Sequence, residues 1–119
     1  MATLPILYGI ASCDSCRKAR NWLDENGVDF RFHDLRKDGV EVQMLERWSE
    51  KIGWEKLLNR QSATWRRIPE ADRENIGPDR AIAAMLEHPT LVKRPVLERG
   101  KTVLSGFTED DYERLFKKN

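Results

Sequence analysis

The sequence predicts an α/β fold, and three features of its pattern lead to that prediction. Roughly the first 33 residues contain a short apolar run, a stretch with helical spacing, and a second run in which apolar and polar residues alternate. About residues 40–90 show helical spacing only. Two short apolar runs around a glycine-containing turn and a capped helix complete the chain. The predicted element order is therefore β-α-β, a helical block, and β-β-α.

The first three elements form a βαβ unit. Residues 4–8 read as a short buried strand that ends at Gly9. A helix follows from about Ser15 to a C-cap at Gly27, with apolar residues at helical spacing: Ala19, Trp22 and Leu23. Residues 28–33 alternate as a second strand. A strand, a helix and a strand within so short a stretch predict that the two strands are parallel.

The middle of the chain is predicted to be helical throughout. Residues 40–58 show helical spacing that Gly53 interrupts. Breaks between short helices are expected at residues 68–69 and 76–78, and another helix at residues 79–88.

An antiparallel hairpin and a final helix follow this block. Residues 94–98 and 101–104 are the expected strands, with Gly100 in the turn between them. Thr108 is the predicted N-cap of the last helix, with Asp111 at the capping-box position. The whole order is a thioredoxin-like layout with a helical insertion at about residues 40–90.

The composition suits one folded domain over residues 1–119. The hydrophobic fraction of 39% excludes a disordered chain. The 21 Lys and Arg residues nearly balance the 20 Asp and Glu residues, so we expect neither nucleic acid nor a membrane surface as a partner. No apolar stretch is long enough to cross a membrane and no signal peptide is visible, so the expected location is cytoplasmic. We expect a monomer.

The only two cysteines, Cys13 and Cys16, form a C-x-x-C motif where the first strand passes into the first helix. The unpaired N–H groups and the dipole of a helix N-terminus favour a thiolate at Cys13. Cys16 lies one turn inside and is expected to be more buried, so Cys13 would attack and Cys16 would resolve the mixed disulfide. Asp14 disfavours the Cys13 thiolate, whereas Arg17 and Lys18 favour it.

Two other interpretations of the cysteine pair stay open. Half of a zinc site would need further ligands, but there is no second cysteine pair, and His33 and His88 lack ligand spacing. Two incidental core cysteines are the other alternative. The position between a strand and a helix favours redox or nucleophilic use, and we predict no metal and no bound cofactor.

Arg94 and Pro95 form the second candidate site feature. A proline at the start of the third predicted strand suits a cis peptide bond, because no ladder N–H is needed there. In a thioredoxin-like layout this turn faces the cysteine-bearing helix, so Arg94 could contact a thiolate or a bound oxyanion. Alternatively, Arg94 is only a solvated cation on the surface. By themselves, Arg60 and Arg66 also look like surface cations.

Six short motifs run through the chain in order: CDSCRKAR at 13–20, FHD at 32–34, GW at 53–54, LLNR at 57–60, TWR at 64–66 and KRPVL at 93–97. Together they resemble the arsenate reductase (ArsC) family, most closely its YffB-type branch, which is related to the regulator Spx. The resemblance covers essentially the whole chain. It implies that Cys13 is the nucleophile, which attacks arsenate in the arsenate reductases. It also implies that Arg60 and Arg94 hold the oxyanion and that Pro95 is the cis-proline.

Two positions depart from the arsenate reductases that the chain resembles. The third family arginine is missing from residues 102–107, and the histidine four residues before the nucleophile is Gly9 here. Losing one charge-assisted contact to the oxyanion costs about 1.5–3 kcal/mol. The branch with Gly-Ile before the cysteine looks like glutathione-using thiol reductases.

The resemblance and these departures lead to one expectation and two alternatives. We expect a glutathione-dependent thiol–disulfide reductase, with glutathione as co-substrate, glutaredoxin as a further candidate partner, and glutathione carboxylates at Lys18, Arg66 or Lys93. The first alternative is a true arsenate reductase coupled to glutathione and glutaredoxin. The second is an Spx-like redox-sensing regulator that binds RNA polymerase.

Overall fold

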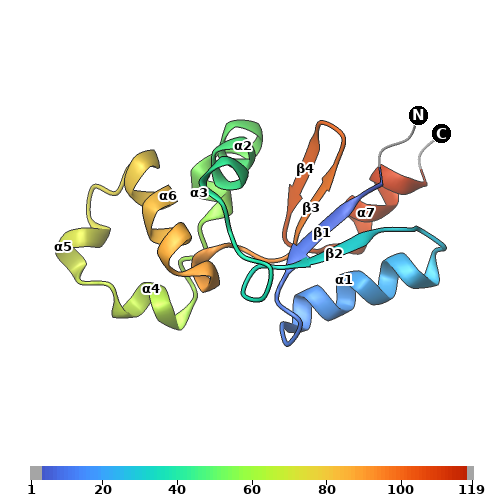
Figure 1. Cartoon of the computed structure of the whole chain (residues 1–119), viewed down its shortest axis with the longest axis horizontal. Helices are drawn as coiled ribbons and strands as arrows, with labels where there is room; N and C mark the ends of the chain where they lie inside the picture. The colour runs from blue at the N-terminus through green and yellow to red at the C-terminus, as the bar shows by residue number, and fades with distance from the viewer. Residues whose placement is uncertain (1–3, 118–119) are drawn as a thin grey trace. The chain divides into compact units, whose positions relative to one another are not determined.

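The computed structural model describes residues 4–117, and the chain divides into two compact units (Figure 1). The sheet unit comprises the residues up to Asp38 and from Arg94 onwards, and the helical unit comprises Gly39–Lys93. Each unit is described by itself. That the whole chain is one domain stays a prediction.

The sheet unit contains four strands and two helices. Its elements are β1 (Ile6–Gly9), α1 (Asp14–Glu25), β2 (Arg31–Asp34), β3 (Val96–Arg99), β4 (Thr102–Ser105) and α7 (Glu109–Phe116). The strand order is β2-β1-β3-β4; β1 and β2 are parallel, and the β1–β3 and β3–β4 pairs are antiparallel. The predicted βαβ unit, the hairpin and the thioredoxin-like fold with a helical insertion are confirmed.

Both N-terminal strands begin later than the sequence pattern predicts. β1 starts at Ile6 rather than residue 4, because Pro5 has no N–H to donate to a ladder. β2 starts at Arg31 rather than residue 28. The N–H of Val28 donates to the carbonyl of Leu23 at 2.9 Å, so this stretch still belongs to the turn that ends α1.

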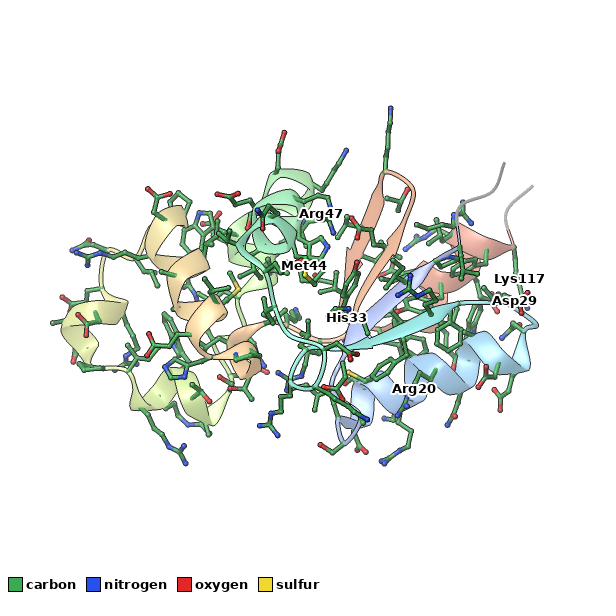
Figure 2. All side chains as sticks on the ribbon, in the orientation of Figure 1. Arg20, Asp29, His33, Met44, Arg47 and Lys117 are labelled. Atoms are coloured by element: carbon green, nitrogen blue, oxygen red, sulfur yellow. The ribbon has the colours of Figure 1, made fainter. Side chains whose placement is uncertain are left out.

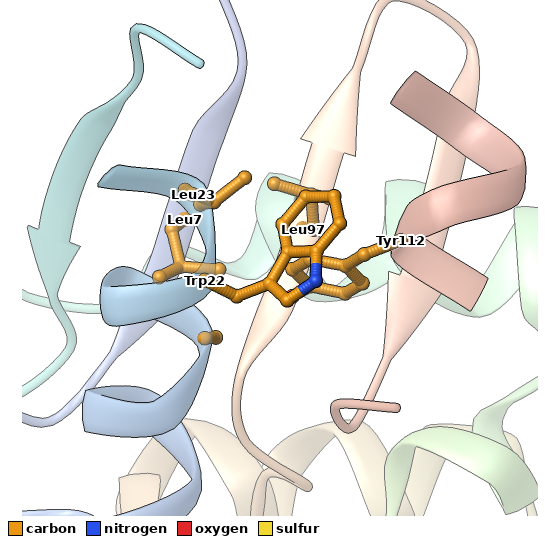
Figure 3. Packing of buried hydrophobic residues seen from close by; sticks show 6 residues of the cluster. Leu7, Trp22, Leu23, Leu97 and Tyr112 are labelled. Atoms are coloured by element: carbon orange, nitrogen blue, oxygen red, sulfur yellow. The ribbon is translucent and has the colours of Figure 1, made fainter. Parts of the chain in front are cut away.

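One cluster of buried hydrophobic residues in the sheet unit packs on one face of the sheet (Figure 3). Leu7 of β1 and Leu97 of β3 are directly paired, so their side chains point to the same side. Trp22 of α1 and Tyr112 of α7 meet edge to face, with ring centroids 5.7 Å apart. Helices α1 and α7 therefore share this face and fix the N-terminus of α1 at the carboxyl end of β1.

Six helical segments make up the helical unit. They are α2 (Val42–Ile52), α3 (Trp54–Leu57), α4 (Ala63–Arg67), α5 (Glu70–Arg73), α6 (Pro78–Glu87) and the 3₁₀ turn η1 (Pro89–Leu91). Gly53, with φ of +89°, separates α2 from α3 where the interruption was predicted. An isolated bridge joins Leu58 to Val92. No helix within residues 4–117 is long and apolar enough to cross a membrane.

Candidate functional site

The C-x-x-C motif lies at the N-terminus of α1, as the sequence predicted. Cys13 is the N-cap residue, with an extended backbone (φ −79°, ψ 129°), and its carbonyl accepts the N–H of Arg17 at 3.0 Å. Its side chain is half-buried, whereas Cys16 is completely buried. The thiol of Cys13 is therefore accessible to a substrate, whereas the thiol of Cys16 is not.

The two thiols differ in acidity. Burial by itself would raise the pKa of Cys13, but the Cys16 backbone N–H, the Cys16 thiol and the Arg94 guanidinium outweigh it and hold this pKa below its ordinary value. Burial raises the pKa of Cys16 to about 12, and the charge of the Cys13 thiolate adds to that increase. Near neutral pH, Cys13 is the thiol poised to lose its proton, and Cys16 stays protonated and donates to it.

Arg94 and Pro95 face this cysteine pair. Arg94 contacts the Cys13 thiolate with its guanidinium, and the Arg94–Pro95 peptide bond is cis, as predicted. The carbonyl of buried Pro95 accepts the N–H of Gly106 at 2.8 Å. The structure thus brings Cys13, Cys16 and Arg94 together beyond the carboxyl end of β1.

Gly9 lies directly against the buried thiol of Cys16. A Cβ atom placed on Gly9 would lie 2.5 Å from the Sγ atom of Cys16 and 3.2 Å from its Cβ atom. Real Cβ atoms do not approach a neighbour so closely, so the bare backbone of Gly9 leaves the space that the Cys16 thiol fills. Gly9, one of the two departures noted in the sequence, and Cys16 therefore share one space in the structure.

A groove of about 260 Å³ lies between α1 and the start of α7 and includes Lys18. Trp22 and Phe107 supply its apolar surface, and its remaining lining residues are polar or charged: Asn21, Glu25 and Glu109. Phe107 directly follows Gly106, and the N–H of Gly106 donates a hydrogen bond to the carbonyl of Pro95. Lys18 is exposed, so its ammonium group is available to a ligand carboxylate in this groove.

Arg60 lies in the helical unit, and its guanidinium is close to the rings of two tryptophans. Its guanidinium carbon is 5.9 Å from the ring centroid of Trp54 and 5.7 Å from that of Trp65. Arg66 donates from Nη1 to the carbonyl of Gln61 at 3.2 Å and so supports the turn that follows Arg60. These contacts orient Arg60, a feature that the sequence pattern did not reveal.

Lys93 also belongs to the helical unit. Its side chain is exposed, and its N–H donates to the carbonyl of Leu57 at 2.7 Å. The backbone of this segment is thereby tied to the end of α3.

Two residues to which the sequence pattern assigned no role, Asp34 and Arg20, contact the loop before Cys13. Both lie within the quoted motifs, at 32–34 and 13–20. Their contacts join elements that are distant along the chain, so spacing alone could not assign them.

The arrangement at Cys13 supports nucleophilic sulfur chemistry. A half-exposed thiolate at a helix N-terminus, with a guanidinium beside it and a protonated thiol behind it, can attack an electrophilic sulfur or an oxyanion centre. The guanidinium can hold the negative charge of either substrate.

Comparisons with known proteins show what this chain is similar to. The family model described as the ArsC family matches residues 8–115. A solved structure titled YFFB (PA3664) protein is 44% identical, with a TM-score of 0.88, and the match covers 91% of this chain and 95% of the other.

Two further relatives carry informative descriptions. An arsenate reductase (ArsC) related protein from Brucella melitensis is 41% identical, with a TM-score of 0.78, over 98% of this chain and 97% of the other. The global transcriptional regulator Spx of Lactiplantibacillus plantarum is 26% identical over 92% of this chain and 84% of its own length. The relatives thus include both a reductase-related protein and a regulator.

Proposed function

The chain belongs to the ArsC family, and from this premise we propose that it is a glutathione-dependent thiol–disulfide reductase with Cys13 as the nucleophile. One observation carries the proposal: a half-exposed cysteine with a lowered pKa contacts Arg94 and a fully buried second cysteine. Because such chemistry needs a pool of reduced glutathione, we place the protein in the cytoplasm.

In the proposed reaction, the Cys13 thiolate attacks one sulfur of a glutathione-linked disulfide. That S–S bond breaks, the other sulfur leaves as a thiolate that takes a proton from water, and Cys13 is left in a mixed disulfide with glutathione. Cys16 then attacks the sulfur of Cys13 and forms the Cys13–Cys16 disulfide. The bond between Cys13 and glutathione breaks, and glutathione leaves as a thiolate that takes up the proton released by Cys16. Two further glutathione molecules reduce that disulfide and become glutathione disulfide.

The electrostatics of the pair suit this order of events. While Cys13 is a thiolate, its negative charge is one of the causes that raise the pKa of Cys16. Once Cys13 has formed a mixed disulfide, that charge is gone and the pKa of Cys16 falls by this contribution. Cys16 therefore becomes a better nucleophile only after Cys13 has reacted.

The remaining residues have supporting roles in the proposal. Arg94 stabilises the Cys13 thiolate and the anionic leaving group, and Pro95 shapes the backbone contacts of the thiol substrate. Lys18 lies in the groove beside Phe107 and would bind a carboxylate of glutathione. Arg60, whose guanidinium is close to two tryptophan rings, would serve as a second anion-binding group, with Arg66 and Lys93 as further candidates for glutathione carboxylates.

Intact mass spectrometry after brief exposure to oxidised glutathione tests the proposal. The wild type should close an internal disulfide, and Cys16→Ser should trap one glutathione on Cys13. Cys13→Ser should remain unmodified, because Cys16 is buried. Equal modification of both variants, or of neither, would overturn the proposed role of the pair.

A true arsenate reductase is the second candidate, favoured by the contact between Cys13 and Arg94 and by the arsenate-reductase-related protein of Brucella melitensis. Arsenite release from arsenate, with glutathione and glutaredoxin present, decides this alternative. No turnover at millimolar arsenate removes it.

The similarity to Spx favours a third candidate, a redox-sensing regulator that binds RNA polymerase. A reversible Cys13–Cys16 disulfide would be its switch. Pull-down with the polymerase α-subunit, in the reduced and the oxidised state, tests it. Absence of binding in both states would exclude this role.

A further inference from the structure

Two side chains hold the loop between β1 and α1 by hydrogen bonds to the backbone of Ala11. The Cys13 N–H donates to the carbonyl of Ile10 at 2.9 Å, so residues 10–13 form a turn. Within it, the N–H of Ala11 donates to Oδ2 of Asp34 at 3.2 Å. The carbonyl of Ala11 accepts Nη2 of Arg20 at 3.1 Å. We call these two contacts the Ala11 clamp.

Each side chain of the clamp is itself oriented by further contacts. The other carboxylate oxygen of Asp34 accepts the N–H groups of Arg36 and Lys37 at 2.9 and 3.0 Å. The guanidinium of Arg20 lies 4.7 Å from the ring centroid of Phe32, and Figure 2 labels Arg20 on α1 below β2. The clamp therefore connects the turn to two elements of regular structure.

We propose that Asp34 and Arg20 are positioning residues for the Cys13 nucleophile. By holding both polar groups of Ala11, they set the turn that places Cys13 at the N-terminus of α1 and beside Arg94. Ala11 and Ser12 are exposed, so packing of their side chains does little to hold the turn. The inference rests on the proposed function, because it assigns a role to residues that act through Cys13.

For Asp34, the sign of the effect separates positioning from simple charge. Through space, the negative charge of Asp34 would disfavour the Cys13 thiolate, so its removal would lower the pKa of Cys13. Positioning predicts the opposite, because a loosened turn weakens the contacts of Cys13 with the Cys16 N–H and with Arg94. Arg94 contacts Cys13 from the turn before β3, and Asp14 and Arg17 of α1, which also lie close to Cys13 along the chain, pair with each other.

The experiment is the pH dependence of Cys13 alkylation by iodoacetamide in the reduced, full-length protein, with the site assigned by peptide mass. The test variants are Asp34→Ala, Asp34→Asn and Arg20→Ala. Matched controls are Asp29→Ala and Arg31→Ala, which remove the same charges from exposed positions of the same unit. Circular dichroism checks that each variant is folded.

We expect Asp34→Ala and Arg20→Ala to raise the pKa of Cys13 and to slow its alkylation near pH 7 by about three- to tenfold. Asp34→Asn keeps one acceptor oxygen and should slow it less, and both controls should leave it unchanged. Unchanged or faster alkylation in Asp34→Ala would overturn the clamp.

If Asp34→Ala does not fold, Asp34→Asn decides the matter, since a charge effect alone would make it react faster than wild type. A wild-type Cys13 that reacts no faster than a cysteine in the unfolded chain would instead overturn the proposed function. The two failures are therefore distinguishable.

Discussion

Replacing Gly9 by alanine should destabilise the protein through a single contact. The new Cβ atom would lie 2.5 Å from Sγ of Cys16, far inside the about 3.5–4.0 Å of an ordinary contact. Cys16 is fully buried and its side chain is short, so the sulfur cannot swing into solvent. Overpacking of this kind costs about 1–3 kcal/mol.

The net effect on stability is somewhat smaller than that cost. Replacing glycine by alanine reduces the entropy of the unfolded chain, which returns about 0.4–1 kcal/mol. The expected loss in the free energy of unfolding is therefore about 1–2 kcal/mol. With a denaturant slope of about 1.5 kcal/mol/M, the midpoint of urea unfolding falls by about 1 M.

The assay is urea unfolding under reducing conditions for Gly9→Ala, Cys16→Ala and the double variant. Removing the thiol leaves the Cβ atom of Cys16 as the nearest neighbour, at 3.2 Å. The double variant should therefore lose less stability than the sum of the single variants, with a coupling of about 0.5–3 kcal/mol.

Gly77→Ala is the control, because nothing lies within 4 Å of the Cβ atom it would introduce and its φ is negative. It should shift stability by less than about 1 kcal/mol. Strict additivity in the cycle, or a Gly9→Ala variant as stable as wild type, would refute the idea that Gly9 and Cys16 share one space.

Three further predictions concern the site and its electrostatics. Arg94→Leu removes a cation that favours the Cys13 thiolate, so the pKa of Cys13 should rise and its alkylation near pH 7 should slow by about three- to tenfold; an unchanged rate would contradict this role. Folding raises the pKa of Cys16 from an ordinary 9.0 to about 12, so the unfolded chain loses this proton at a lower pH than the folded protein. The stability that this thiol contributes is therefore complete below about pH 9 and should be lost as the pH rises towards 12. Thermal unfolding across that range should show the loss, and Cys16→Ala should reduce its slope. Trp54→Ala removes one of the two rings close to Arg60. It should weaken the binding of arsenate or sulfate, measured by calorimetry, by about two- to fivefold. Trp54→Phe keeps an aromatic ring and should lose less affinity.

Local signals in the sequence were sufficient to predict the order of the elements and to predict which cysteine of the pair is the more buried. Gly53 separates two helices and Thr108 caps α7 by accepting the N–H of Asp111, both as predicted. The cis bond before Pro95 and the burial of Cys16 relative to Cys13 are also confirmed. These features depend on residues within a few positions of one another, which is the range that propensity, capping and periodicity describe. The functional roles of all the site residues stay predictions: Cys13, Cys16, Arg94 and Pro95 as well as Arg60, Arg66, Lys18 and Lys93.

Only the tertiary structure decided which distant groups meet. The two polar groups of Ala11 bond to Asp34 and Arg20, which are 23 and 9 residues away along the chain. The space over Gly9 is filled by the sulfur of Cys16, and the guanidinium of Arg60 lies over the rings of Trp54 and Trp65. Such contacts follow from how the strands and helices pack, so spacing in the sequence carries no direct signal for them. By itself the sequence determined which cysteine stands at the N-terminus of α1; the packing determined which residues contact the turn before it.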